Sequence, residues 1–488
     1  MSAFKSTACR LAALAALGMG CLQASAQTIT ALAHQPPAGV FMPFLLTDGR
    51  VLIQANNDVD FYLLTPDKKG SYVNGTWSKA ASFPSSWNYG PDAEASQVLG
   101  DGRVIFQGGE YNFGNFLLTT IGGVYDPVKD KWTKLAPPPG WQQIGDSPSA
   151  ILADGRYIVG RKLDEQMAAL DPLTMQWTLL GTDGKTDFNS EEGWTLMPDG
   201  SILTADVLNA PNSERYLPDQ QKWISDGTTV VDLHSDTTIH GCLQYPGGCY
   251  YPPGEIGPQI LRPDGTVVVF GSSNGEHPGH TSLYTPGMTE TDPGTWAPGP
   301  DFSLGNDSAN DVPAVLLPSG NVLVEGVSAR LYEYDGKTMT PTLSSNGGML
   351  IMLPSGETLV TANQVEVYAS KGKPQKAWAP KITKAPSSMT RGQTYKVMGM
   401  QFNGMSQAAG FGDEFETSTN YPLARITNTA TGDVVYARTH DHSTMGVQTG
   451  KKKVFTNIDI PSTAEKGAST LVVVANGIPS KPVSVTIE

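Results

Sequence analysis

The chain repeats one pattern of apolar and polar positions seven times between residues 40 and 370. Each unit holds an apolar run, a short polar turn that ends in glycine, and a second apolar run, as in LLTDGRVLI, VLGDGRVIF and ILADGRYIV. The turn glycines recur about every fifty residues, and they are Gly49, Gly102, Gly155, Gly200, Gly265, Gly320 and Gly356. Because glycine readily adopts the positive φ of a tight turn, each unit predicts two antiparallel strands joined as a hairpin.

A second pattern follows the turns: an aromatic strand, a polar turn and then a tryptophan, as in GGVYDPVKDKWTKL. The sixth unit, RLYEYDGKTMTPTL, lacks the tryptophan. The tryptophans of this slot are Trp77, Trp132, Trp177, Trp223, Trp296 and Trp378. Two hairpins make a four-stranded sheet, and seven such sheets around an axis bury the faces that one sheet alone exposes. The sequence therefore predicts a seven-bladed β-propeller over residues 27–379, with the tryptophans between blades and QTITALAHQ completing the last blade.

After Trp378 the period ends, and short alternating strands are separated by turn residues, as in KVFTNIDIP and STLVVVANGIPSKPVSVTIE. This pattern predicts an immunoglobulin-like β-sandwich over residues 380–488. The 53 glycines and 36 prolines of the chain agree with a fold of strands and turns. The predicted fold class is all-β, a propeller followed by a sandwich.

The first 26 residues are typical of a secretory signal peptide: Lys5 and Arg10 precede an apolar run that ends in Ala24-Ser25-Ala26. We expect cleavage after Ala26 and a secreted or periplasmic protein, with no membrane insertion because the apolar run is too short. A lipoprotein cleaved at Cys21 is the alternative, but an aliphatic residue is missing three places before that cysteine.

Removal of Lys5 and Arg10, the only charged residues of that segment, changes the formal net charge from −14 to −16. Such a charge argues against nucleic acid and anionic membrane surfaces as partners, and it favours a neutral or cationic ligand. Cys242 and Cys249 are the cysteines that remain after cleavage. In an exported protein they are expected to form a disulfide that staples the loop HGCLQYPGGCYYPPG.

With these repeats and the closing STLVVVANGIPSKPVSV, the chain resembles the galactose oxidase and glyoxal oxidase superfamily, whose members join a kelch-type propeller to an immunoglobulin-like domain. The resemblance implies a copper site built from a Tyr-His pair, a Tyr cross-linked to Cys, and a His that the last domain carries into the channel. RTHDHSTMGV, with His440 and His442, corresponds to that last loop. Asn310 and Asp311 stand where the Tyr-His pair is required, so copper is not the expected cofactor.

Acidic residues lie eight to ten residues before the turn glycine in five of the seven units. They are Asp92, Glu94, Asp146, Glu191, Glu192, Glu255 and Asp311, whereas the first and last units have Val40 and Asn346. Because the innermost strand of a blade begins at this depth, we expect the carboxylates to converge at one mouth of the channel, within reach of His440 and His442.

Converging carboxylates fit several kinds of chemistry. They can bind a divalent cation, with Asp311, His440 and His442 as candidate ligands. They can act as acid and base on a glycosidic bond or form a proton shuttle with His442. They can also cap turns and hold water without chemistry.

The leading hypothesis is an exported protein that binds a glycan or related extracellular polymer at the channel mouth and acts on it by acid/base chemistry. The candidate catalytic residues are Glu192, Glu255, Asp311 and His442, and the candidate ligand contacts are Asp92, Glu94, Asp146, Glu191, Tyr89, Tyr251 and His440. Such an enzyme fits a hydrolase or lyase of carbohydrates better than a copper oxidase. The alternatives are a diverged copper-radical oxidase and a non-catalytic adhesive or structural propeller, and the sequence does not indicate an oligomeric state.

Three further groups of residues have chemistry of their own. His277 and His280 have a metal-like spacing, but they lie in a Gly/Pro loop. Asp413, Glu414 and Glu416 form an acidic loop of the last domain. Aromatic residues before the channel strands offer rings that stack on sugar faces, and they are Trp87, Tyr89, Tyr245, Tyr250 and Tyr251.

Overall fold

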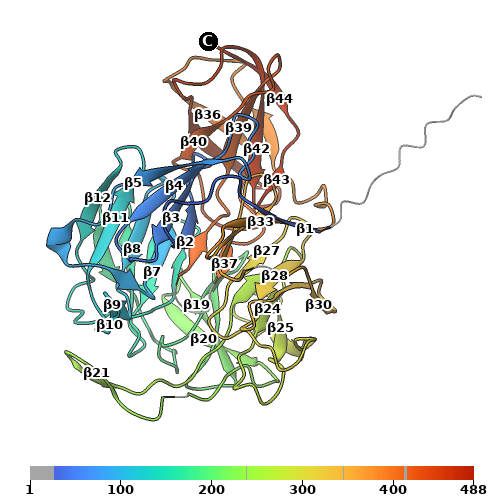
Figure 1. The fold of residues 1–488 in the computed structure, drawn as a ribbon. Coiled ribbons are helices and arrows are strands. Elements are labelled where there is room, and N and C mark those ends of the chain that lie inside the picture. The colour runs from blue at the N-terminus through green and yellow to red at the C-terminus, as the bar shows by residue number, and fades with distance from the viewer. Residues whose placement is uncertain (1–26, 238, 345, 411–414) are drawn as a thin grey trace, which may run out of the picture.

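The computed structural model describes residues 27–237, 239–344, 346–410 and 415–488. In these residues seven antiparallel blades of four strands surround a common axis, and a β-sandwich stands on one face of the ring (Figure 1). The predicted signal peptide lies outside the described residues. Among those described, no helix has the length and apolar character of a membrane span.

The first strand of every blade lies nearest the axis, and each of these strands contacts its counterparts in the two neighbouring blades, which closes a ring. These innermost strands are β2 (Val40–Leu45), β7 (Ala95–Val98), β13 (Ser149–Ile151), β17 (Thr195–Leu196), β23 (Gln259–Leu261), β27 (Ala314–Leu316) and β31 (Met349–Met352). Almost all of their residues are buried, because sheets of neighbouring blades cover both faces.

The other strands of each blade follow outward in chain order. The second strands are β3 (Val51–Ala55), β8 (Val104–Gln107), β14 (Tyr157–Gly160), β18 (Ile202–Ala205), β24 (Val267–Phe270), β28 (Val322–Glu325) and β32 (Thr358–Thr361). The third strands are β4 (Phe61–Thr65), β11 (Gly122–Asp126), β15 (Met167–Asp171), β19 (Asn212–Leu217), β25 (Thr281–Thr285), β29 (Leu331–Tyr334) and β33 (Glu366–Ala369). The outer strands of the first six blades are β5 (Thr76–Ala80), β12 (Lys131–Leu135), β16 (Gln176–Leu179), β20 (Lys222–Thr228), β26 (Thr295–Pro298) and β30 (Met339–Pro341).

The ring closes through the N-terminal strand β1 (Thr28–Ala31), which is the outer strand of the seventh blade. It pairs antiparallel with β33, so that Thr28 faces Ala369 and Ala31 faces Glu366. The prediction that QTITALAHQ completes the last blade is confirmed. Since the last blade joins the two ends of the repeat region, the propeller cannot open without breaking this sheet.

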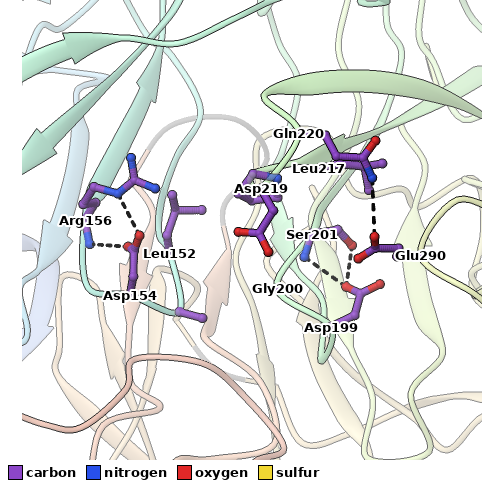
Figure 2. A pocket seen from close by; sticks show the side chains of 12 residues that line it. Leu152, Asp154, Arg156, Asp199, Gly200, Ser201, Leu217, Asp219, Gln220 and Glu290 are labelled. Atoms are coloured by element: carbon purple, nitrogen blue, oxygen red, sulfur yellow. Dashed lines mark hydrogen bonds and ion pairs between the residues drawn. The ribbon is translucent and has the colours of Figure 1, made fainter.

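The repeated turn between the first and second strands has the expected conformation. Gly102 adopts a φ of 87°, and the Oδ1 of Asp101 accepts a hydrogen bond of 3.0 Å from the backbone N–H of Arg103. Figure 2 shows two further turns of this kind, which line a hollow of about 200 Å³: Asp154 pairs with Arg156, and Asp199 bonds Ser201. The carboxylates of these turns therefore stabilise the turns in which they lie.

The repeated tryptophans join neighbouring blades, as expected. Trp132 is 4% exposed, and its ring N–H donates to the Ala81 carbonyl of the preceding blade at 2.8 Å. Trp177 bonds the Ala136 carbonyl at 2.7 Å in the same way. Trp378 does not occupy this slot, because β1 supplies the outer strand of the seventh blade; it packs against the turn at Gly320 instead.

The last part of the chain forms two packed layers around its own apolar core. Its strands are β34 (Lys381–Lys384), β35 (Ser388–Met389), β36 (Thr394–Met400), β39 (Leu423–Asn428), β40 (Val434–His440), β41 (Lys453–Asp459), β42 (Gly467–Ala475), β43 (Ile478–Pro479) and β44 (Val483–Ile487). Strand β40 crosses between the layers: its first half pairs with β39 and its second half with β41.

A hairpin of this domain enters the propeller. Strands β37 (Ala408–Gly410) and β38 (Thr417–Ser418) extend the sixth blade inward, because β37 pairs with β27. The Oε1 of Gln97 on β7 accepts the Ser418 N–H at 2.9 Å, and the Phe415 N–H reaches the Glu94 carbonyl at 3.2 Å. The hairpin thus lies in the channel between the second and sixth blades.

The segment RTHDHS, which was expected to enter the channel, lies elsewhere. The Thr439 N–H donates to the Thr47 carbonyl at 3.1 Å, and the Met445 N–H donates to the Ala153 carbonyl at 3.0 Å. Thr47 and Ala153 belong to the glycine turns, at the end of the innermost strands. We call this side of the propeller the turn face, and the opposite opening, where the innermost strands begin, the acidic mouth.

Candidate functional site

A pocket of about 340 Å³ opens at the acidic mouth. Carboxyl groups make up much of its lining, and they come from Asp92, Glu110, Asp146, Glu191, Glu255 and Asp311. Apolar and aromatic groups form the rest of the wall, chiefly Phe41, Tyr111, Ile239, Leu243, Pro252 and Phe415. The predicted convergence of Asp92, Asp146, Glu191, Glu255 and Asp311 is therefore confirmed in its geometry.

The backbone adopts the same left-handed conformation just before several of the innermost strands. Ala93, Glu191 and Asp311 have φ values of 54°, 61° and 42°, and Gly145 reaches 86° at the equivalent place in the third blade. Left-handed backbone is costly for residues other than glycine, by about 1 kcal/mol or more. This turn comes just before each innermost strand and directs the neighbouring side chains toward the mouth, so the acids share one place because the turn recurs.

One buried lysine neutralises part of the acidic mouth. The Lys162 side chain has no exposed surface, and its Nζ lies 2.6 Å from Glu191 Oε1, 3.5 Å from Glu110 Oε1 and against Asp146. Burial by itself lowers the pKa of Lys162, but the carboxylates of Asp146 and Glu191 raise it well above the usual value. Lys162 is therefore charged, and the described lining carries more acid than base.

Glu255 and Asp311 form a carboxyl pair in the pocket. They come from neighbouring blades, and a hydrogen bond joins their side chains. Desolvation by the surrounding walls, together with the charge of Glu191, raises the pKa of Asp311 to about 7. Asp311 still has exposed surface in the pocket, so it can exchange protons with water or a ligand near neutral pH.

The stapled loop forms one wall of the pocket. Cys242 and Cys249 form the predicted disulfide, with their Cα atoms 5.4 Å apart, across the hairpin of β21 (Leu243–Tyr245) and β22 (Gly248–Tyr250). Figure 1 shows this hairpin reaching out on the side of the propeller opposite the β-sandwich. Tyr250, at the end of this hairpin, is buried, and its hydroxyl donates to Glu191 of the pocket lining.

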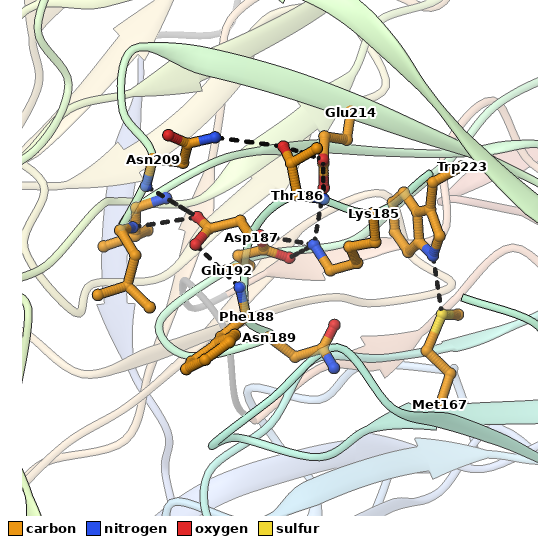
Figure 3. A network of polar contacts seen from close by, with 12 residues as sticks. Met167, Lys185, Thr186, Asp187, Phe188, Asn189, Glu192, Asn209, Glu214 and Trp223 are labelled. Carbon is orange, nitrogen blue, oxygen red and sulfur yellow. Dashed lines mark hydrogen bonds and ion pairs between the residues drawn. The ribbon is translucent and has the colours of Figure 1, made fainter. Parts of the chain in front are cut away.

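Glu192 does not face the pocket, although it follows Glu191 in the chain. Its carboxylate binds Lys185 inside the fourth blade, with an Oε1 to Nζ distance of 2.9 Å and no exposed side-chain surface (Figure 3). The left-handed turn at Glu191 directs its side chain to the mouth, whereas the next side chain, that of Glu192, points into the blade. The assignment of Glu192 to the acid/base set is therefore wrong in its geometry.

The predicted ligand contacts Tyr89, Glu94 and Tyr251 also lie outside the pocket lining. Tyr89 is 1% exposed, and its hydroxyl donates to the Gly108 carbonyl at 2.8 Å, so it supports the second blade. Tyr251 is 68% exposed beside the stapled hairpin. Glu94 is fully buried, and neither carboxylate oxygen has a hydrogen-bond partner among the described residues.

Replacing Glu94 by glutamine is expected to stabilise the protein at pH 8. Burial, followed by the charge of Asp92, raises the pKa of Glu94 well above its usual value. A raised carboxyl pKa favours folding at low pH, and that stability is lost as the pH rises toward the folded-state pKa. Glu94→Gln removes this loss, so we expect a gain of about 1 kcal/mol at pH 8 and no gain at pH 4, measured by urea denaturation. Equal effects at both pH values would contradict the assignment.

His440 and His442 are separated from the acids by the length of the innermost strands. His442 lies beside Gly100 of a glycine turn and accepts or donates a 2.9 Å hydrogen bond with Thr456, while His440 contacts Asp441 and Asp459. Burial lowers the pKa of His442 to about 3, so the ring is neutral at ordinary pH. The expected proton shuttle of His442 with the acids, and a metal site shared by Asp311, His440 and His442, do not fit this arrangement.

The remaining candidates also have local explanations. His277 and His280 stack on each other with ring centres 4.8 Å apart, and His280 pairs with Asp301. Glu416 lies on the channel hairpin, while Asp413 and Glu414 are outside the described residues. Trp87 packs against Phe83 within the second blade.

Sequence reasoning missed Glu110 and Lys162. Both follow second strands, β8 and β14, which run antiparallel to the innermost strands and so return to the same mouth. The available signal was a charged residue two or three places after a buried apolar strand. The acids before the innermost strands were found by counting residues back from the turn glycine. Counting forward from the same glycine, past the end of the second strand, finds both Glu110 and Lys162.

No family model matches the chain. A kelch-like protein of Aspergillus terreus, terF, is 28% identical over 95 residues, which are 19% of this chain and about a fifth (20%) of that protein. Among solved structures, a fungal alcohol oxidase of the AA5 family in complex with copper superposes over 95% of this chain and 99% of its own, with 13% identity and a TM-score of 0.52. A streptogramin B lyase matches 70% of this chain and 97% of its own at 12% identity and a TM-score of 0.45. The chain thus shares its fold with that alcohol oxidase, a β-propeller followed by a C-terminal β-sandwich.

The residues of the acidic mouth do not fit the copper that the alcohol oxidase holds. Copper(II) prefers imidazole nitrogen and tetragonal geometry. Among the described residues that line the pocket there is no histidine and no cysteine, and the side chains at the depth of the Tyr-His pair are Asn310 and Asp311. The phenol that lines the pocket, Tyr111, and that of Tyr250 both have their pKa values raised by burial, which keeps them protonated.

Proposed function

We propose that the acidic mouth binds a glycan or related extracellular polymer and acts on it by acid/base chemistry, with Asp311 and Glu255 as the proton-transferring pair. The observation that carries this proposal is the hydrogen-bonded carboxyl pair in an open pocket, with the pKa of Asp311 raised to about 7. A carboxyl that is half protonated at neutral pH can serve as a general acid or a general base.

The composition of the pocket supports a ligand rich in hydroxyl or amino groups. Carboxylates accept hydrogen bonds from both, and they repel anions. Phe41 and Phe415, whose ring centres are 5.1 Å apart, and Tyr111 offer the apolar surface on which a sugar ring can rest. The fit is therefore to neutral or cationic saccharides and not to polyuronates.

Asp311 and Glu255 have different roles in the proposed reaction. Burial and the charge of Glu191 favour the neutral form of Asp311, while the hydrogen bond with Glu255 favours its charged form, so the two carboxyl groups share a proton near neutral pH. With the proton on Asp311, that group delivers it to the leaving oxygen while the Glu255 carboxylate takes one from the attacking water, so the pair holds one proton before and after the step. Lys162 holds Asp146 and Glu191 in place behind the pair, so that the pocket keeps its shape when the charge changes.

A panel of oligosaccharides tests the proposal. Neutral and amino-sugar oligomers are expected to bind and release new reducing or unsaturated ends at pH 6, whereas uronate oligomers are not bound. Glu255→Gln should lower the rate at least 100-fold, while Asp301→Asn, on an exposed loop, leaves it unchanged. Binding by calorimetry with no product from any member would reduce the proposal to binding alone, and no binding from any member would overturn it.

A further inference from the structure

Inside the fourth blade, four carboxyl groups lie around the ammonium group of Lys185: Asp187, Glu192 and Glu214, which Figure 3 labels, and Asp206. Lys185 Nζ lies 2.9 Å from Glu192 Oε1 and 3.0 Å from Glu214 Oε2, and these three side chains are at most 2% exposed. Oxygens of Asp187, Glu192 and Asp206 lie within 4.8 Å of one another. A single lysine leaves this buried cluster short of positive charge, and isolated buried charge is strongly unfavourable.

The four carboxyl groups are not equally paired. One oxygen of Asp187 accepts backbone N–H groups from Val207, Leu208 and Asn209 at 2.8, 3.0 and 3.3 Å. Asp206 is 2% exposed, and neither of its oxygens has a hydrogen-bond partner among the described residues. An unpartnered buried carboxyl aimed at two others requires a proton, a water molecule or a cation.

Two neutral oxygens beside the cluster are also unpartnered among the described residues: Asn189 Oδ1 and Thr204 Oγ1. The Nδ2 of Asn189 donates to the carbonyls of Asp164 at 2.8 Å and Gln166 at 2.9 Å, which fixes its amide oxygen on the other side. In Figure 3 that oxygen points toward Lys185 and Glu192. Thr204 faces Glu214 across the β18–β19 ladder, on the same side of the sheet as Asp206.

We propose that Asp206, Glu192 and Asp187 bind a calcium ion, with the amide oxygen of Asn189 as a neutral ligand. Every donor is an oxygen, which favours Ca²⁺ over the transition metals, and the dry surroundings disfavour Mg²⁺, which retains its water. This site is separate from the acidic mouth and does not depend on the function proposed there. It does hold Glu192, whose neighbour Glu191 lines the mouth, so the ion fixes the segment that positions Glu191.

Protons compete with the ion for the same oxygens. Burial, followed by the charge of Glu192, raises the pKa of Asp206 to about 9, and burial raises the pKa of Glu192 to about 8 against the opposing effect of Lys185. Calcium must displace these protons. Affinity therefore increases as the pH rises from 6 to 9, with Asp187, Glu214 and Lys185 as the other ionisable groups of the cluster.

Elemental analysis and terbium luminescence test the site. After dialysis against micromolar Ca²⁺, the wild-type protein should retain one calcium per chain that Asp206→Asn loses. Tb³⁺ in the site should be sensitised by Trp223, whose ring centre is 4.5 Å from Lys185 Nζ, and the emission should be displaced by Ca²⁺. Chelation should lower the Tm of the wild type by about 3 °C.

The controls separate this site from the acidic mouth and from misfolding. Asp219→Asn, in the exposed β19–β20 turn of the same blade, should keep its calcium, and so should Glu255→Gln. In chelator, Asp206→Asn should be at least as stable as the wild type, because the substitution removes only a carboxyl that is otherwise protonated. The proposal is overturned if the wild type retains no calcium and shows no Ca²⁺-displaceable Tb³⁺ emission, or if Asp206→Asn retains as much calcium as the wild type.

Discussion

Lys162→Met is expected to destabilise the protein by about 3–5 kcal/mol at pH 8, because it leaves Asp146 and Glu191 as buried carboxylates without their shared cation. Methionine fills a similar volume, so the loss comes from charge and not from a cavity. Urea denaturation with global fluorescence gives the free energy of unfolding directly.

The pH dependence separates charge from packing in this variant. Without Lys162, the pKa values of the neighbouring carboxyl groups rise further in the folded state. Stability is then largest below their unfolded-state pKa near 4 and is lost as the pH rises through the folded-state values, so the deficit should shrink between pH 8 and pH 5. Lys129→Met, which removes an exposed partner of Asp126, should change stability by less than about 0.5 kcal/mol. A deficit of Lys162→Met that is equal at both pH values would contradict the account of the mouth.

Asp311→Asn is expected to lower the rate on the preferred saccharide by about 10²–10⁴-fold while leaving binding within a few fold. Asparagine keeps the shape and a hydrogen bond to Glu255, but it cannot transfer a proton. Rates from product release, with dissociation constants from calorimetry on the same protein, separate the two effects.

The pH profile of the wild type should report the same group. With the pKa of Asp311 raised to about 7, the protonated acid is present at pH 6 and lost as the pH rises to 8, so the rate should fall across that interval. Asp311→Asn should remove this dependence, and Asp301→Asn should retain it. A wild-type rate that is flat from pH 6 to pH 8 would argue against Asp311 as the acid.

The repeat made most of the fold predictable. Gly49 and its six counterparts each occupy a turn that requires positive φ, and this requirement is local enough to be read from the sequence. The same regularity placed Asp92, Asp146, Glu191, Glu255 and Asp311 at one depth, and the structure brings them into one pocket. Ring closure by β1 was also predictable, because the last blade needs a fourth strand and the segment before the first repeat can supply it.

The errors arose at residues whose position depends on side-chain direction or on packing between distant parts of the chain. The number of residues before the turn glycine does not distinguish Glu191 from Glu192. The left-handed φ of Glu191 turns its side chain to the mouth, whereas Glu192 points into the blade and binds Lys185. His440 and His442 were misplaced because the contact between the sandwich and the propeller is set by surfaces far apart in the chain. Lys162 and Lys185 were overlooked because a buried lysine is recognisable only once its carboxylate partners are located.

A crystal structure of Asp311→Asn protein with its bound saccharide tests the central claim most directly. The account predicts a sugar ring in the acidic mouth, with hydroxyl or amino groups in hydrogen-bonding range of Glu255 and residue 311 and with Phe41 or Tyr111 against the ring. A saccharide bound at saturating concentration on the β-sandwich or the turn face, with none in the acidic mouth, would contradict it.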